Sequence, residues 1–325
     1  LKNFKEALLG LFSSKNPKKY PENSMLNNLQ LLFVWAPIIN VQIILEGIFV
    51  GAVFALSAYG LALVWGVMNI KNLAQGDFVI AGGYIALALH YANVPLLLIM
   101  LIVIVVMFIY GWLIYITMIR RIIDQDMFVS LLATFGLSLL MQQVMNLIFG
   151  PEVQTIDMQM PVYDFFDNMV TVPSAKILSL VMAAVLAIAV VLFMKKSRTG
   201  QAIRATAQDP RAAKVLGIDT DRVYAFTFAL NAALCGAAGV LVSIIWVIQP
   251  FYGITYSVRT FAIVTAAGLG NLPAVIGAGF GIGLFEKYTG MIFGTAYEVA
   301  APVLILLIVL AWRQRLLKKN RQVVQ

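Results

Sequence analysis

Charged residues, cysteine and histidine are all scarce in this sequence of 325 residues. Only 12% of the residues are charged, about half of the roughly 25% found in soluble globular domains. The single cysteine, Cys235, and the single histidine, His90, exclude an internal disulfide and a cysteine- or histidine-based metal site. There is no GxxxxGK[ST] phosphate-binding loop and no Gly-Lys dipeptide, so any ATP hydrolysis must occur in another chain. We therefore expect no catalytic residues, no metal and no cofactor.

Hydrophobic residues make up 61% of the chain and come in long, uninterrupted blocks. Residues 43–67 contain one charge, Glu46, and residues 94–119 contain none. Each block exceeds the ~20 residues that a helix needs to cross a bilayer core of about 30 Å. Lipid admits only helices or closed barrels, and the blocks lack the period of two that barrel strands show. The sequence predicts an all-α integral membrane protein.

The basic residues mark one side of the membrane. Nineteen of the 23 Lys and Arg lie in the N-terminal tail, at Arg120–Arg121, in 195–222 and in 313–321. By the positive-inside rule these regions are cytoplasmic. The segment 150–176 carries four acidic residues and one lysine, which favours the outer side. This distribution accounts for the net charge of +8 without nucleic acid.

Counting hydrophobic segments between these patches predicts a polytopic bundle of about ten membrane segments with both termini cytoplasmic. Eight or nine segments remain an alternative, because the first can lie along the interface and 255–270 can be re-entrant. The predicted domains are a cytoplasmic tail (1–25), a membrane domain (26–312) and a basic cytoplasmic tail (313–325). The predicted segments are 26–40, 42–66, 72–91, 95–118, 127–149, 175–194, 223–247, 255–270, 272–289 and 296–312.

Glycines at helix-packing spacing recur in these segments. Small residues four apart let two helix backbones approach closely, so such pairs predict a compact bundle. The pairs are Gly47/Gly51, Gly277/Gly281 and Gly279/Gly283.

The cytoplasmic loop 195–222 predicts two short helices, about 199–208 and 210–216. Asp209–Pro210 separates them, because proline favours the first position of a helix, and Gly217 ends the second. Short helices on the cytoplasmic face offer a surface that another protein can bind. A solvated basic loop beside anionic lipid head groups is an equal alternative.

The segment 69–84 combines amides, glycines and a charge. Asn72 can cap a helix beginning at Leu73, with Gln75 reaching back in a capping box. Gly76 and the pair Gly82–Gly83 weaken this helix, as in the discontinuous helices of transporters.

Ionisable side chains within the membrane segments are functional candidates by default, since burying one costs at least about 2.5–3.5 kcal/mol. Asp77 is the main candidate, for gating or transport; a structural cap and packing contact is the alternative. Glu46 fits a structural role better. Arg259 is expected near the outer side, where its stem can reach water.

Four stretches carry a resemblance to the branched-chain amino acid ABC transporter permeases, a family related to urea and amide permeases. One of them, "LLATFGLSLLMQQVMNLIFGP" (131–151), fits the middle of the family. "AIRATAQDPRAAKVLGID" (202–219) resembles the loop that docks on the ATPase, and "GLGNLPAVIGAGFGIGLFE" (268–286) resembles the Gly-rich penultimate segment. "GLALVWGVMNIKNLAQGDFVIAGGY" (60–84) resembles the N-terminal signature, although Gln75 stands in place of the usual His and Gly83 in place of Ala. Its matching positions are Asn72, Ala74, Gly76, Asp77, Gly82 and Tyr84. The resemblance covers about residues 42–315.

This resemblance implies a permease subunit of a bacterial-type inner membrane. It would pair with a homologous permease or a second copy, bind two ABC ATPases and receive substrate from an extracytoplasmic binding protein. The implied substrate-path or gating residues are Asn72, Gln75, Gly76, Asp77, Gly82 and Tyr84. The implied ATPase-coupling residues are Arg204, Asp209, Arg211, Ala212, Ala213 and Gly217.

The cargo hypothesis is a branched-chain or other hydrophobic amino acid, with urea or a short amide as the nearest alternative. A stand-alone secondary transporter or channel would need several intramembrane charges and a repeat. Only Glu46, Asp77, Arg259 and Glu286 qualify, and no clear repeat is visible. An intramembrane enzyme would need a nucleophile with a base, or a metal motif, and the sequence shows neither.

Overall fold

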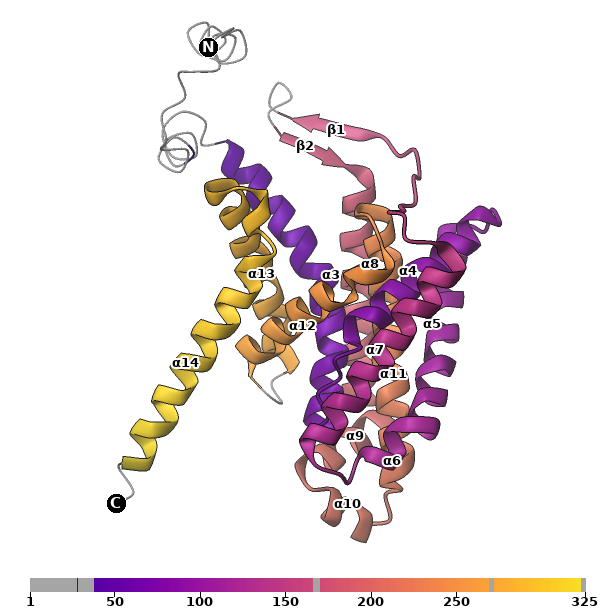
Figure 1. Ribbon diagram of the computed structural model, residues 1–325, viewed down its shortest axis with the longest axis vertical. Coiled ribbons are helices and arrows are strands. Elements are labelled where there is room, and N and C mark those ends of the chain that lie inside the picture. Colours follow the sequence, from indigo (N-terminus) through magenta and orange to yellow (C-terminus); the bar gives the residue numbers. More distant parts are fainter. Residues whose placement is uncertain (1–27, 29–37, 166–169, 269–271, 323–325) are drawn as a thin grey trace, which may run out of the picture.

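The computed structural model describes residues 28, 38–165, 170–268 and 272–322, without the side chains of 272, 313–314 and 316–322. These residues form a helical bundle with one small β-hairpin (Figure 1). The predicted all-α class is therefore confirmed. The predicted segment 26–40 and the N-terminal tail lie almost entirely outside the described residues.

Five helical spans in the described part of the chain are long and apolar enough to cross a membrane. The span 96–122 comprises α5 (Leu96–Ile114), a short π-helix (Tyr115–Ile119) and α6 (Arg120–Ile122). The others are α3 (Ile39–Met68), α7 (Met127–Phe149), α8 (Ser174–Lys196) and α11 (Thr220–Ile245). Four further helices complete the bundle: α4 (Gln75–Tyr91), α12 (Gly253–Ala267), α13 (Leu272–Phe293) and α14 (Ala300–Gln322).

Helices α3 and α11 form the centre of the bundle. In each, 89% of the most apolar window is buried, compared with 28% in α5, α7 and α8. The outer helices expose leucine, isoleucine and valine side chains, as a lipid-facing surface requires.

Glycines hold α3 against α13. A Cβ atom added at Gly51 or Gly279 would collide with the backbone or side chains of the other helix. Gly47 and Gly283 make the same kind of contact. Two of the three predicted pairs, Gly47/Gly51 and Gly279/Gly283, therefore act in packing. The third pair, Gly277/Gly281, faces open space.

The two ends of the bundle differ in structure. Helix α8 leads into two short helices, α9 (Arg198–Gln208) and α10 (Pro210–Val215), at one end (Figure 1). At the other end β1 (Val162–Phe165) pairs antiparallel with β2 (Val170–Pro173), a hairpin that the sequence analysis did not predict. The start of α3 lies at this hairpin end, because Gln42 donates a hydrogen bond to the Thr171 carbonyl oxygen (3.1 Å).

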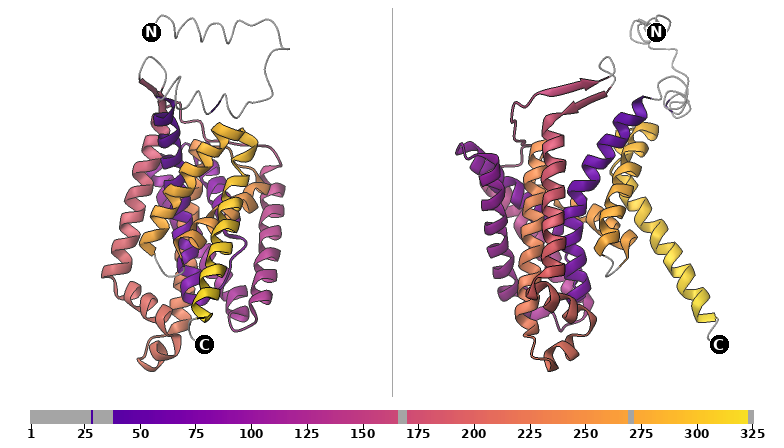
Figure 2. Two further views of the ribbon diagram at one scale, coloured as in Figure 1. Left: turned by 90° about the vertical axis from the view of Figure 1, so that its left-hand side faces the viewer. Right: turned by 180° about the vertical axis from the view of Figure 1, so that it is seen from behind.

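Helices α12 and α13 form a hairpin that begins and ends on the β-hairpin side (Figures 1 and 2). Helix α12 has 15 residues, so at 1.5 Å per residue it is about 22 Å long. It is thus shorter than the bilayer core. Helix α13 returns along α3, and Tyr288 near its end donates a hydrogen bond to Asn40 (3.2 Å). Helix α14 then runs toward the α9–α10 end (Figure 2).

Candidate functional site

The helix pair α9–α10 matches the two predicted short helices to within one residue at each end. The Ser197 hydroxyl caps α9 by accepting a hydrogen bond from the Gly200 N–H (2.9 Å). Asp209 caps α10 by accepting from the N–H groups of Arg211 (2.8 Å) and Ala212 (3.1 Å). Asp209 therefore acts as an N-cap at the break between the helices.

Helix α10 presents an apolar tip to its surroundings. Val215 and Leu216 are 87% and 80% exposed, although both are large and hydrophobic. These two residues were not predicted as contact residues, because the charges and the helix breakers are the stronger signals in the sequence of this loop. Ala213, named there as a coupling residue, is only 2% exposed and faces the bundle, so it cannot contact a partner directly. The other predicted coupling residues are exposed: Arg204, Asp209, Arg211, Ala212 and Gly217.

The predicted capping box at the start of α4 is wrong. Helix α4 begins at Gln75, not Leu73, and no side chain caps its N-terminal residue, Ala74. Asn72 accepts a hydrogen bond from the Ala74 N–H (3.1 Å). Gln75 instead points across the bundle, because its amide finds buried partners on α3 and α11.

The Gln75 side chain makes a two-way amide contact with Asn231 of α11. Gln75 Nε2 donates to Asn231 Oδ1 (2.9 Å), and Asn231 Nδ2 donates to Gln75 Oε1 (3.1 Å). Gln75 also donates to the Ser57 carbonyl oxygen of α3 (3.0 Å). Both amides are fully buried, so this contact joins three helices in the bundle centre.

The Gln75–Asn231 pair should show measurable coupling. Gln75→Leu or Asn231→Leu alone leaves a buried amide without its main partner, at a cost of about 1–3 kcal/mol. The double variant should lose less than the sum of the two, by about 0.6–1.7 kcal/mol, the range found for hydrogen bonds between membrane helices. Unfolding of all four proteins in mixed micelles would measure this difference; strict additivity would show that the two amides do not interact.

Asp77 lies in a closed polar contact between α4 and α7. The Ser138 hydroxyl donates to one carboxylate oxygen (2.5 Å), and Gln142 Nε2 donates to the other (3.0 Å). Asp77 is completely buried and packs against Gly253 at the start of α12, where a Cβ would collide with it. Its carboxylate therefore links three helices. Ser138 and Gln142 carried no signal in the sequence analysis.

The glycines of α4 do not interrupt it, contrary to the prediction. Helix α4 is continuous, and its glycines allow close backbone contact. Gly76 lies against the Gly253 carbonyl group of α12, and Gly82 lies against Gly236 of α11. Tyr84, also predicted as a path residue, is 1% exposed and stacks on Phe149, with ring centroids 4.5 Å apart.

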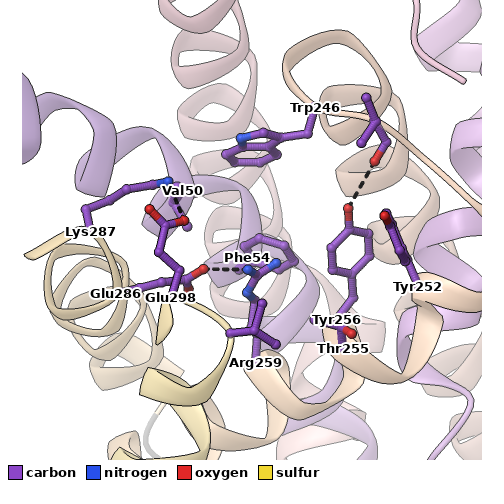
Figure 3. A pocket seen from close by; sticks show the side chains of 12 residues that line it. Val50, Phe54, Trp246, Tyr252, Thr255, Tyr256, Arg259, Glu286, Lys287 and Glu298 are labelled. Carbon is purple, nitrogen blue, oxygen red and sulfur yellow. Dashed lines mark hydrogen bonds and ion pairs between the residues drawn. The ribbon is translucent and has the colours of Figure 1, made fainter. Parts of the chain in front are cut away.

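A cavity of about 370 Å³ lies on the β-hairpin side of the bundle, between α3, α12, α13 and the end of α11 (Figure 3). On its wall the Arg259 guanidinium of α12 pairs with the Glu286 carboxylate of α13 at 2.5 Å. The side chains are 15% and 2% exposed. Arg259 thus keeps a small exposed part in the cavity, while Glu286 and two aromatic rings hold most of its side chain within the bundle.

Aromatic side chains surround the Arg259 guanidinium. It lies 5.0 Å from the centroid of Phe54 and 5.7 Å from that of Tyr256, within cation–π range. Trp246 stacks on Phe54 at 6.0 Å (Figure 3). A second acid–base pair, Lys287–Glu298 (3.1 Å), completes the polar lining.

Long apolar helices, an exposed helix pair at one end and a charged, aromatic cavity at the other define a polytopic helical membrane protein. Among the described residues there is no group of three or more acidic, histidine or cysteine side chains that could hold a metal ion. The chain belongs to the family described as "Branched-chain amino acid transport system / permease component", whose model matches residues 43–312.

Several curated relatives span nearly the whole chain. The high-affinity branched-chain amino acid transport system permease protein LivH of Escherichia coli is 28% identical over 83% of this chain and 92% of its own length. The corresponding permease protein BraD of Pseudomonas aeruginosa is 27% identical over 84% and 93%. A probable branched-chain amino acid transport permease protein of Methanocaldococcus jannaschii is 28% identical over 83% and 89%. No solved structure matches the chain significantly.

Proposed function

We propose that this chain is the permease subunit of an ABC importer that carries branched-chain or other hydrophobic amino acids across a bacterial-type inner membrane. The family match over residues 43–312 carries this proposal. The relatives are described as permeases for branched-chain amino acids, which favours this cargo over urea or a short amide. In the described part of the chain the spans contain few unpaired charges that could serve an ion-driven mechanism, which argues against a stand-alone secondary transporter.

The helix pair α9–α10 is the proposed element that docks on an ABC ATPase subunit, and the importer would carry two such ATPases. Its exposed apolar tip at Val215 and Leu216 stands beside Arg211 and Lys214, the mixture of an apolar centre and a charged rim that suits a protein interface. The caps at Ser197 and Asp209 hold the two helices in a fixed shape. A force applied to α10 would therefore pass through α9 to α8.

The proposed topology has ten membrane segments and cytoplasmic termini. Helix α3 starts at the outer end, so a cytoplasmic N-terminus requires one crossing before Ile39, as proposed for 26–40. The α12–α13 hairpin is proposed to enter the membrane from the outer side and to return to it. The hairpin therefore does not change the side from which α14 starts, and α14 brings the C-terminus to the cytoplasm. A second permease chain and an extracytoplasmic binding protein would complete the importer.

The segment from Asn72 to Tyr84 is proposed to control gating through helix packing. Gln75 ties α4 to α3 and α11, and Asp77 ties it to α7. Movement of α4 would have to exchange these buried hydrogen bonds for others. The segment is thus suited to two discrete arrangements, since packed interfaces do not deform continuously.

Reconstituted transport tests the proposed function. The chain would be co-expressed with the permease, ATPases and binding protein encoded beside it and assembled in proteoliposomes. We expect ATP-dependent uptake of labelled leucine, isoleucine and valine, and none of urea. Uptake of urea alone would contradict the proposal, as would full leucine uptake by this chain without an ATPase.

A charge at the tip of α10 should release the ATPases. In Val215→Asp a carboxylate replaces an apolar contact, and a hydrophobic interface loses about 1.5–3 kcal/mol for a buried valine, or roughly ten- to a hundredfold in affinity. Co-purification of the ATPase subunits measures this loss. Val162→Asp is the matched control, since Val162 is 51% exposed on the hairpin at the other end. Equal ATPase recovery with both variants would refute docking at α10.

A further inference from the structure

We infer that the cavity walled by Arg259 and Glu286 binds the free amino acid as a zwitterion, through its carboxylate and its ammonium group together. The inference rests on the proposed function and adds to it a place and a mode of binding. The cavity volume of about 370 Å³ lies at the small end of the roughly 300–1,000 Å³ range of small-molecule sites.

The Arg259–Glu286 ion pair leaves hydrogen-bonding atoms unused on both side chains. One guanidinium nitrogen, Nη2, donates to one carboxylate oxygen, Oε1. Arg259 Nε and Glu286 Oε2 are buried and have no hydrogen-bond partner among the described residues. Buried polar groups are normally paired, so the ion pair on the cavity wall keeps one unused cationic donor and one unused anionic acceptor. A substrate carboxylate would match the donor, and a substrate ammonium would match the acceptor.

The charges of the cavity wall balance. The pairs Arg259–Glu286 and Lys287–Glu298 contribute two positive and two negative groups. A ligand with a single net charge would leave one of these largely desolvated groups in excess, which is unfavourable in a site partly shielded from water. A zwitterion keeps the site neutral. This balance favours a free amino acid over a lone carboxylate, an amine or an inorganic ion.

The rest of the lining suits an apolar side chain. Phe54, Trp246 and Tyr256 form an aromatic wall, and valines 50, 247 and 299 complete the apolar part. Phe54 and the valines carry no hydrogen-bonding side-chain group, and the hydroxyl of Tyr256 already donates to the Val247 carbonyl oxygen (3.4 Å). This part of the lining therefore suits the side chains of leucine, isoleucine and valine.

The position of the cavity fits delivery from outside. Trp246 directly follows α11, whose first residue, Thr220, lies just after α10. The cavity is thus at the opposite end of α11 from the proposed ATPase-docking tip. Substrate released by an outer binding protein would meet this end first.

Fluorescence of Trp246 provides a direct test on the full-length chain in lipid nanodiscs. We expect L-leucine to change the emission saturably, and Trp246→Phe to remove that change while the other four tryptophans remain. 4-Methylpentanoate, which is leucine without its ammonium group, and isoamylamine, which is leucine without its carboxylate, should each bind at least about tenfold more weakly. Equal binding of either analogue would overturn the zwitterion mode.

Variants of the ion pair complete the test. Arg259→Gln/Glu286→Gln keeps two hydrogen-bonding side chains of similar size but removes both charges, and we expect at least about tenfold weaker leucine binding. Lys176→Gln is the matched control, because Lys176 pairs with Glu46 (2.5 Å) and neither residue lines the cavity. Unchanged leucine binding in the double variant would overturn the site. A double variant with altered elution or melting would be replaced by Val50→Trp, which should fill the cavity and abolish binding without touching the pair.

Uptake by the assembled importer separates this inference from the proposed function. If the double variant takes up leucine at the wild-type rate, the cavity is not the binding site, and the proposed function is unaffected. If the wild-type importer takes up no branched-chain amino acid, the proposed function itself is contradicted.

Discussion

Replacing Arg259 by methionine is expected to lower the free energy of unfolding by about 3–5 kcal/mol. The change removes the cation that faces Glu286, whose side chain is 2% exposed within the bundle. A buried carboxylate without its partner loses the attraction that offset its desolvation. The two cation–π contacts with Phe54 and Tyr256 disappear as well. Reversible unfolding in mixed micelles would measure the loss.

A second variant separates the charge effect from packing. Arg259→Met/Glu286→Leu replaces the whole pair by apolar side chains of similar volume, and we expect it to recover most of the lost stability. Lys176→Met should cost less, because the Lys176–Glu46 pair is 17% and 19% exposed. If the double variant proved as unstable as Arg259→Met alone, packing of the arginine stem, not its charge, would be the cause.

Replacing Gly239 by alanine is expected to disrupt the contact between α4 and α11. A Cβ at this position would collide with the Val79 carbonyl oxygen and the Gly83 N–H, which are backbone atoms that cannot rotate away. The helices would have to separate, and overpacking of this kind costs about 1–3 kcal/mol or more. Because Gln75 and Asp77 lie on the same helix, their buried hydrogen bonds would also weaken.

Gly136→Ala provides the matched control. Gly136 lies within α7 and has no neighbour that a Cβ would meet. Alanine favours a helix over glycine by about 0.8–1 kcal/mol, so this variant should be neutral or slightly more stable. Thermal melting followed by size-exclusion chromatography would compare the two. Equal melting temperatures would show that the α4–α11 contact is looser than the structure indicates.

Much of the fold was predictable because its signals are local. The long apolar blocks predicted α3, α5, α7, α8 and α11, since transfer of side chains into lipid adds up residue by residue. The helix pair α9–α10 was predicted almost to the residue. Asp209–Pro210 provided both an N-cap and a first-turn proline, and these act over three residues only.

Predictions failed where a local rule competed with a distant partner. Gln75 was assigned to a capping box with Asn72, but it bonds to Asn231, 156 residues away in the sequence. Gly82 was expected to weaken a helix, whereas the close approach of Gly236 makes it a packing residue. The Arg259–Glu286 pair spans two helices, and neither residue alone indicates the other.

The sequence by itself determined that the chain is a helical membrane protein, which end carries the basic loop, and where the short helices of that loop begin and end. Each of these follows from hydrophobicity, charge or capping within a few turns of one helix. Only the tertiary structure decided which buried polar groups meet. That outcome depends on the depth and rotation of every helix relative to its neighbours, and those are set by glycine contacts such as Gly51–Gly279 and Gly82–Gly236. The cavity with its paired charges is a product of that packing.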